Sequence, residues 1–178
     1  MEPRLLGFIA GDGWCYYERA GRKYLVGFTQ NSCKMEIVSI YASLLSRYGK
    51  IRIKRKKRNA LDVYVQSKTL YKRVRLLIDN IAKYFERLTT SEKVAFIGGF
   101  IDAEACVEEK RCRIFNKNLY LLESIRRFLR DNGINSYLYW DKNVFVLEVK
   151  YSNFPKLVAL VGRYSVKIAA RCAPYTRA

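Results

Sequence analysis

Two acidic residues, Asp12 and Glu104, stand at matching places in two similar stretches of the sequence. Residues 5–13 recur as residues 97–105, and both stretches carry small residues at a spacing of one helical turn. Glycine weakens a helix unless it allows another backbone to come close. We therefore expect the stretches to form helices that pack face to face and bring the two carboxylates together. Two converging carboxylates can hold divalent cations, as metal-assisted phosphodiester hydrolysis requires.

Either acid taken singly has an ordinary structural explanation. Asp12 precedes Gly13, and Asp-Gly is a common turn dipeptide, while Glu104 could simply end a helix. The helix macrodipole disfavours a negative charge at a C-terminal end, and adjacent carboxylates repel each other. Because bound cations would relieve both costs, the repeated register favours a metal site over two unrelated structural residues.

The composition indicates a polyanionic partner and narrows the chemistry. The chain has 178 residues, with 34 Lys and Arg against 16 Asp and Glu and a net charge of +18. A folded basic surface of this kind is typical of nucleic-acid binding, the alternative being a solvated basic surface. Histidine is absent, which excludes a His general base, a His metal ligand and Ser-His or Cys-His triads.

The cysteines and the N-terminus bear on the cellular setting. No stretch approaches the roughly 20 apolar residues that span a bilayer, and the N-terminus lacks the pattern of a secretory signal. We expect an intracellular protein, cytoplasmic if the source is prokaryotic, with an archaeal source favoured, and organellar otherwise. No CxxC pair occurs among the cysteines, which we expect to be reduced and buried: Cys15, Cys33, Cys106, Cys112 and Cys172.

Hydrophobic periodicity predicts the same order of elements in both parts of the chain. The first unit is expected to hold a helix at 4–11, strands at 14–19 and 23–30, a helix at 32–48, strands at 51–55 and 61–66, and a helix at 69–87.

The second unit repeats that order. Thr90 or Ser91 is expected to cap its first helix, and residues 164–178 form either further helix or a basic extension. We expect the first half of the chain to span residues 1–88, a linker residues 89–91 and the second half residues 92–178. The expected elements are a helix at 92–103, strands at 105–109 and 111–117, a helix at 118–132, strands at 135–140 and 144–150, and a helix from 152.

The repeated stretches and the element order resemble the LAGLIDADG homing endonucleases of the single-chain, two-motif type. The resemblance covers nearly the whole chain, with LLGFIAGDG at 5–13 and IGGFIDAEA at 97–105 as the two motifs. It implies an α+β fold in which two pseudo-twofold-related αββαββα units form saddle-shaped antiparallel sheets, with the motif helices packed at the interface. The family's metal-binding acids fall on Asp12 and Glu104, and a helix-interface position falls on Ala10 and Asp102. Ala10 departs from the motif's Asp, and Ala105 from its final Gly.

The resemblance also implies an activity. It is that of a metal-dependent endonuclease that hydrolyses one phosphodiester on each strand of a long, pseudo-palindromic site in double-stranded DNA. Mg²⁺ would be the cofactor, Mn²⁺ would substitute, and Ca²⁺ would support binding without cleavage. A monomer with no obligate protein partner and an intron-encoded gene would fit that family. The alternatives are an RNA-binding intron maturase, a cleavage-inactive DNA-binding protein of the same fold, and a basic protein that coats nucleic acid without specificity.

Strand alternation predicts which side chains face the DNA. The apolar sets Leu61, Val63 and Val65, Ile51 and Ile53, and Cys112 and Ile114 should point inward, and the polar sets between them outward. Because Arg can read guanine and Gln adenine, the base-contact candidates are Arg52, Gln66, Arg111 and Arg113, while Lys54 and Lys150 are phosphate candidates. Each of these could instead be a solvated surface residue.

The basic run of residues 54–58 is interpreted as a phosphate clamp at a hairpin tip, in preference to a nuclear-localisation signal. The full set of predicted DNA-binding residues is Arg22, Lys23, Thr29, Arg52, Lys54, Arg55, Lys57, Arg58, Asp62, Tyr64, Gln66, Arg111, Arg113, Tyr137, Tyr139, Lys142 and Glu148.

Polar residues near the centre complete the predicted catalytic set. By resemblance, Gln30 and Asn116 match a position beside the scissile phosphates. Lys117 or Lys150 is the predicted basic residue that stabilises the pentacoordinate phosphate or tunes the attacking water. The first half offers Asn31 and Gln66 at the corresponding places, an asymmetry that predicts two unequal half-sites.

Overall fold

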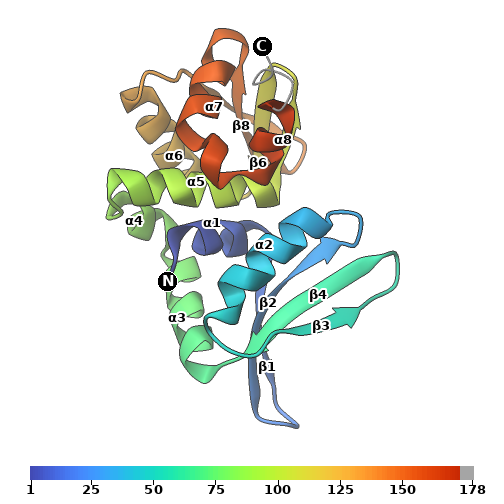
Figure 1. Cartoon of the computed structure of the whole chain (residues 1–178). Coiled ribbons are helices and arrows are strands. Elements are labelled where there is room, and N and C mark those ends of the chain that lie inside the picture. The colour runs from blue at the N-terminus through green and yellow to red at the C-terminus, as the bar shows by residue number, and fades with distance from the viewer. Residues whose placement is uncertain (173–178) are drawn as a thin grey trace.

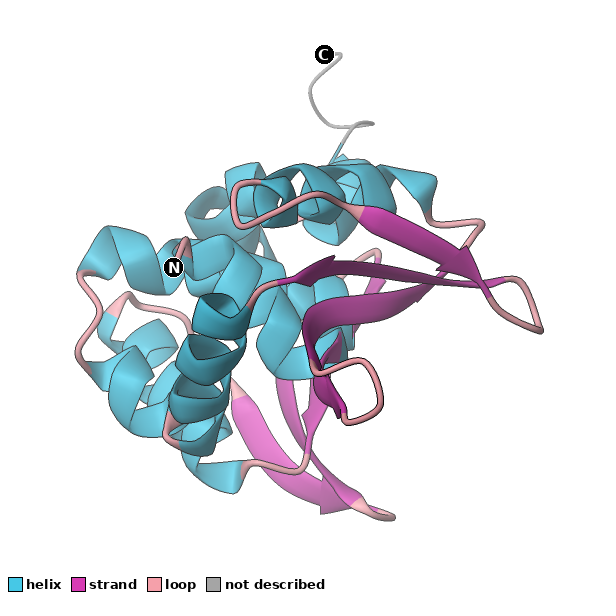
Figure 2. Cartoon of the chain, turned by 90° about the horizontal axis from the view of Figure 1, so that it is seen from below, coloured by secondary structure: helices cyan, strands magenta, loops and turns pink. Residues whose placement is uncertain are grey.

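Two units of similar architecture meet along a pair of central helices. The computed structural model describes residues 1–172. Helices α1 (Pro3–Asp12) and α5 (Thr90–Glu104) run side by side across the middle of the molecule, with one unit on either side (Figure 1). The view from below shows most helices gathered on one side and the strands of the two sheets on the other (Figure 2). The end of the predicted tail, from residue 173, lies outside the described residues.

The first unit builds one antiparallel sheet, with the strand order β1-β2-β4-β3. Its elements after α1 are β1 (Gly13–Glu18), β2 (Lys23–Asn31), α2 (Met35–Ser46), β3 (Arg52–Arg55), β4 (Ala60–Gln66), α3 (Lys68–Asp79) and α4 (Ile81–Glu86).

The second unit has the equivalent order β5-β6-β8-β7, which confirms the α+β class and the repeat of αββαββα-like units. Its elements after α5 are β5 (Ala105–Glu108), β6 (Arg111–Asn116), α6 (Leu119–Asp131), β7 (Tyr137–Asp141), β8 (Val144–Lys150), the short 3₁₀ turn Tyr151–Asn153, α7 (Phe154–Val161), a second such turn at Gly162–Tyr164, and α8 (Val166–Cys172).

Glycines set the spacing between the central helices. A Cβ on Gly7 would lie 2.0 Å from the carbonyl oxygen of Phe96, and a Cβ on Gly99 would lie 2.0 Å from that of Arg4. The contact is reciprocal, because Gly7 and Gly99 are equivalent in the repeat and so are the residues that they face, Phe96 and Arg4. These positions therefore need glycine, and the reciprocity expresses the internal pseudo-twofold relation.

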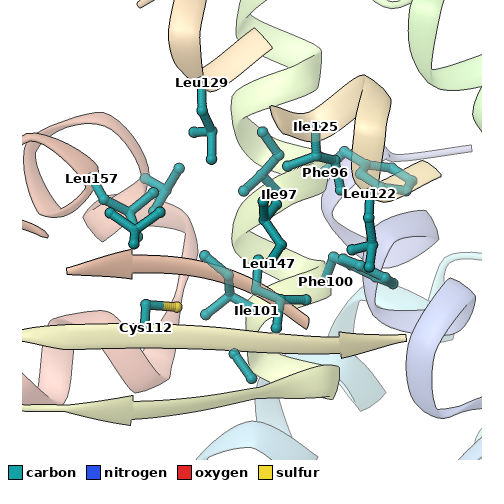
Figure 3. Close-up of a cluster of buried hydrophobic side chains, with 14 of the residues drawn as sticks. Phe96, Ile97, Phe100, Ile101, Cys112, Leu122, Ile125, Leu129, Leu147 and Leu157 are labelled. Atoms are coloured by element: carbon teal, nitrogen blue, oxygen red, sulfur yellow. The ribbon is translucent and has the colours of Figure 1, made fainter. Parts of the chain in front are cut away.

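Two hydrophobic cores lie on either side of this helix pair. The first lies behind the β1–β4 sheet, where the rings of Phe8 and Tyr41 stack with their centroids 3.7 Å apart. The second packs α5 against β6, β8, α6 and α7 (Figure 3). Three residues that precede α5, Ile81, Phe85 and Leu88, also belong to the second core, so α4 is packed with the unit that follows it in the chain.

Several element boundaries differ from those predicted. The single helix expected at 69–87 is two helices, because the chain bends at Asn80, whose φ of −125° is not helical. The N-cap of α5 is Thr89 rather than Thr90 or Ser91, since Thr89 and Glu92 form a reciprocal capping box. After residue 164, the described part of the tail is the helix α8.

The expectation that the cysteines are buried is wrong for two of them. Cys112 is buried and Cys15 is partly buried, but Cys33 and Cys106 are exposed, and all four are free thiols. Cys106 alternates with core residues along β5 and so points outward. Among residues 1–172, no helix combines the length and apolar character needed to cross a membrane.

Candidate active site

Asp12 and Glu104 end the two central helices and lie close to each other. Each helix stops directly after its acid, because the next residue, Gly13 or Ala105, has an extended backbone with ψ of 160° or 147°. A Cβ on Gly11 would lie 2.6 Å from the Glu104 Cγ and 2.6 Å from the Ala103 Cβ. The last turn of α1 therefore touches the base of the Glu104 side chain, and the helix pair brings both carboxylates to one place.

Each carboxylate accepts a hydrogen bond from an amide side chain on its own sheet. Gln30 at the end of β2 donates from Nε2 to Asp12 Oδ2 at 2.7 Å. Asn116 at the end of β6 donates from Nδ2 to Glu104 Oε1 at 2.9 Å. The matching polar positions predicted from the sequence are thus direct neighbours of the acids, and the two halves have equivalent arrangements.

Burial raises the pKa of both carboxyl groups. The pKa of Asp12 is raised by desolvation, against which the charges of Lys167 and Lys34 and the bond from Gln30 act. The pKa of Glu104 is raised by desolvation and then by the negative charge of Asp12, while Asn116 and Lys167 lower it. The charge of Asp12 thus disfavours a second negative charge on Glu104, and a cation bound beside both groups would offset that repulsion.

The lysines predicted for the site do not contact the acids. Lys117 follows Asn116 but is exposed. Lys150 pairs with Arg111 at the opposite end of β6 from Asn116, five residues or about 17 Å along the strand. It lies over the rings of Tyr137 and Tyr151, so the structure does not bring it to the carboxylate pair.

Two other lysines supply the positive charge near the acids. Lys34 precedes α2, and Lys167 lies in the first turn of α8. Both act electrostatically on Asp12, and Lys167 also acts on Glu104. No sequence motif marks either residue, because both reach the site through tertiary packing of elements outside the repeated stretches.

The acid pair suits a hard divalent cation bound together with substrate. Mg²⁺ takes oxygen ligands and is commonly held by one or two protein carboxylates with phosphate oxygens and water completing its shell. Within residues 1–172 no cluster of three or more His, Cys, Asp or Glu side chains is placed to hold a metal. Asp12 and Glu104 therefore fit an ion whose remaining ligands come from DNA and solvent.

The predicted DNA-facing side chains form rows across the two sheets. Thr29, Asp62 and Lys54 are directly opposite one another on β2, β4 and β3. Opposed residues in an antiparallel sheet share one face, so such rows belong to a common surface. The remaining predicted residues lie on the strands or turns of the two sheets: Arg22, Lys23, Arg52, Arg55, Lys57, Arg58, Tyr64 and Gln66 in the first unit, and Arg111, Arg113, Tyr137, Tyr139, Lys142 and Glu148 in the second.

Two acids in this set were expected to be exposed but are buried. Asp62 and Glu148 are each only 7% exposed. Asp62 accepts a hydrogen bond from Thr29 Oγ1 at 2.7 Å and pairs with Lys56 at 2.8 Å. The basic and hydroxyl side chains around these acids cover them, so the acids orient their neighbours on the sheet face.

The prediction that Ile53 is buried is also wrong. Its side chain was expected to point into a core but is 57% exposed. All four residues of β3 are exposed, because this strand lies at the edge of the sheet. The inward positions Val63, Cys112 and Ile114 are buried as predicted.

Arg111 and Arg113 both contact Glu108, and Arg111 also lies 3.7 Å from Glu148. Arg113 contacts Glu108 Oε1 at 2.6 Å, and the Arg111 Nε donates to Glu108 Oε2 at 3.0 Å. These contacts raise the pKa of both guanidinium groups. The two arginines thus start from a shared, preorganised position on the outer face of β6.

Sequence comparison relates the chain to a protein family. The profile of the LAGLIDADG-like domain family matches residues 91–162. The homing endonuclease I-DmoI from Desulfurococcus mucosus is 32% identical over 170 residues, covering 89% of this chain and 85% of that protein.

Solved structures agree with this similarity. The crystal structure of I-DmoI in complex with DNA and Ca covers 99% of this chain and 97% of its own, with a TM-score of 0.77 at 27% identity. The complex with DNA and Mn gives a TM-score of 0.74 at 29% identity, covering 90% and 94%. The homing endonuclease I-WcaI, bound to its DNA recognition sequence, shares the fold with a TM-score of 0.69 at 12% identity, covering 93% and 81%.

Proposed function

Because the chain belongs to the LAGLIDADG homing endonucleases, we propose that it cuts both strands of a long, pseudo-palindromic site in double-stranded DNA with divalent metal ions. The observation that carries this proposal is the paired carboxylates at the ends of α1 and α5, set between two sheets with basic outer faces. I-DmoI, 32% identical to this chain over 170 residues, is named a homing endonuclease and has been solved with DNA and Mn or Ca, and as a point variant with DNA and Mg.

Asp12 and Glu104 are the proposed metal ligands, with Mg²⁺ as the cofactor, Mn²⁺ as a substitute and Ca²⁺ as a non-catalytic stand-in. A bound cation would supply Lewis-acid stabilisation of phosphate charge and an activated water. Gln30 and Asn116 fix the carboxylate orientations through the hydrogen bonds described above. Side chains of this kind hold metal ligands in position and tune the site.

The outer sheet faces are the proposed DNA-binding surface. Arg52, Gln66, Arg111 and Arg113 remain the candidates for base contacts, and Lys54 with the turn residues Lys57 and Arg58 for phosphate contacts. Asp62 and Glu148 act by orienting basic neighbours. Lys117 is exposed beside Asn116, from where it is proposed to meet the DNA backbone close to the acid pair.

Cleavage of a randomised library of double-stranded DNA in Mg²⁺ tests this function and reveals the site. We expect one sequence family to be cut on both strands, and the same sequence to be bound without cutting in Ca²⁺. Binding of one sequence without cutting in Mg²⁺ or Mn²⁺ would identify a cleavage-inactive DNA-binding protein. Equal binding of all sequences would identify a nucleic-acid coat, and preference for a folded intron RNA would identify a maturase.

The monomeric state, the cellular location and the genetic origin remain predictions. A monomer follows from the internal repeat, since one chain supplies both acids. An archaeal, cytoplasmic enzyme encoded in an intron is proposed, and the archaeal source of the I-DmoI relative supports the first part.

A further inference from the structure

The N-terminal end of helix α8 is hydrogen-bonded to a buried carboxylate on α5. Asp102, two residues before Glu104, is 0% exposed. Its oxygens accept hydrogen bonds from Ser165 Oγ at 2.7 Å, the Val166 N–H at 3.1 Å and the Lys167 N–H at 3.0 Å. The first amides of a helix have no partner within it, and a buried carboxylate is tolerated only when it is well hydrogen-bonded. The Asp102 carboxylate therefore accepts hydrogen bonds from the first N–H groups of α8, and these bonds fix the position of α8.

The same carboxylate is held from the first unit. The Tyr41 hydroxyl on α2 donates to Asp102 Oδ2 at 2.7 Å. The Arg4 guanidinium on α1 lies 3.7 Å from the same oxygen and 5.4 Å from the centre of the Tyr41 ring. Asp102 thus joins α1, α2, α5 and α8 at one buried point next to the acid pair.

The side chain of Lys167 returns from α8 to the end of α5. Its Nζ donates to the carbonyl oxygen of Ala105 at 2.7 Å and to that of Ala103 at 3.3 Å. These two residues flank Glu104. The last carbonyls of a helix lack partners and carry partial negative charge, so an ammonium group is well placed there. One side chain consequently ties together the backbone on both sides of a proposed metal ligand.

We propose that Lys167 is a positioning residue of the acid pair, and that α8 is docked on Asp102 in order to present it. Lys167 holds the end of α5 in the conformation that directs Glu104 towards Asp12, and it keeps one positive charge beside the two carboxylates. This inference rests on the proposed function, because it assigns a role within the same site. Burial lowers the pKa of Lys167, and the charges of Asp12 and Asp102 oppose that shift, as expected for a group enclosed with the acids.

The central experiment compares Lys167→Met with Lys156→Met. Lys156 is a matched control, because its Nζ also donates to a backbone carbonyl, that of Gly133 at 3.1 Å, at an exposed place and not beside the acid pair. Hydrogen exchange of residues 103–107, DNA affinity in Ca²⁺ and single-turnover cleavage in Mg²⁺ are measured for both.

For Lys167→Met we expect faster exchange in residues 103–107 and a cleavage rate lower by about 10- to 100-fold, as for other groups that orient metal ligands. DNA affinity in Ca²⁺ should stay close to that of the wild type. Lys167→Arg should recover most of the rate, because a guanidinium can also donate to the two carbonyls. Lys156→Met should change none of the three readouts.

A second variant, Ser165→Ala, tests the docking of α8 with little risk to folding. It removes one of the bonds to Asp102 and also the capping bond that Ser165 Oγ accepts from the Ile168 N–H at 3.2 Å. Exchange in α8 should therefore accelerate, exchange in residues 103–107 should accelerate less, and cleavage should fall less than in Lys167→Met. Cleavage by Lys167→Met at the rate of Lys156→Met would overturn the proposal, as would unchanged exchange in residues 103–107. If the wild type cuts no DNA, the proposed function fails, whereas the exchange measurement still decides whether Lys167 holds the end of α5.

Discussion

The two acids of the site have equivalent positions but unequal support. Asp12 and Glu104 each end a central helix and each accept a hydrogen bond from an amide on the neighbouring strand. Two residues earlier, however, the first helix has the apolar Ala10, whereas the second has the buried Asp102 with α8 attached. The groups proposed to meet the metal ions are thus kept in both halves, while the scaffold behind them differs. The residues that are proposed to bind shared metal ions must be equivalent in the two halves, whereas the residues that support them can differ.

The edge strands of the two sheets differ in a second way. β3 carries Arg52, Lys54 and Arg55, all exposed. β7 exposes aromatic rings instead, with Tyr137 and Tyr139 being 56% and 41% exposed. The first edge offers charge to a polyanion, and the second offers ring faces and hydroxyls, so we expect the halves to contribute to DNA binding by different physical means.

The equivalence of the acids is tested most severely by Asp12→Asn and Glu104→Gln. Each substitution removes one charge from the pair while keeping the shape of the side chain. We expect each to lower single-turnover cleavage in Mg²⁺ by about 10²- to 10³-fold or more, with DNA affinity in Ca²⁺ largely retained. Asp131→Asn at the exposed end of α6 is the control. A variant at either acid that linearises a plasmid carrying the selected site at the wild-type rate refutes the assignment.

The reciprocity of the helix contact is tested by Gly7→Ala and Gly99→Ala. Each added methyl group would meet a backbone carbonyl at 2.0 Å, so the helices must move apart. We expect each variant to lose about 1–3 kcal/mol in the free energy of unfolding, measured with denaturant.

Gly162→Ala is the matched control for the two glycine variants. Its Cβ would meet no atom closer than 3.8 Å, and its φ of −55° suits alanine. We expect a change within about 0.5 kcal/mol. Very different losses for Gly7→Ala and Gly99→Ala would show that the interface is not symmetric in energy.

The electrostatic cost of the pair predicts a pH dependence of stability. Desolvation raises the pKa of Asp12 above 3.8 and that of Glu104 above 4.5. Ionisation therefore costs the folded state free energy, and this cost is absent below the ordinary values and complete above the raised ones. Without metal, the double variant Asp12→Asn with Glu104→Gln should be more stable than the wild type near neutral pH. The difference should shrink as the pH falls to about 4, as followed by denaturant unfolding, and a difference that grows on acidification would contradict the assignment.

The edge strands predict the smallest and most selective effects. Each phosphate contact contributes about 0.9 to the slope of log affinity against log salt. The double variant Lys54→Ala with Arg55→Ala on β3 should therefore lower that slope by about 1 to 2. Tyr137→Ala with Tyr139→Ala should weaken binding without changing the slope. If the tyrosine variant changes the slope as much as the basic variant does, the contrast between the edges is wrong.

Local sequence signals predicted the repeat, the acid pair and the strand hairpins, because each depends on spacing along the chain or on similarity between its two halves. The amides Gln30 and Asn116 came from the family resemblance. The support of Glu104 could not be predicted in this way. Asp102 meets Tyr41 and Ser165, which are far from it in the sequence, and Lys167 carries no motif. The burial of Asp62 likewise depends on Lys56 and Thr29 closing over it, which strand alternation alone does not reveal.

The packing of α4 limits how the halves of this protein can be exchanged for engineering. Ile81, Phe85 and Leu88 precede α5 in the chain but fill the second core. A chimera that takes its first half from this chain and its second half from a relative would combine α4 with a core shaped for another helix. Recombination is better made near Asn80, where α3 ends and α4 begins, so that α4 travels with the core that it completes.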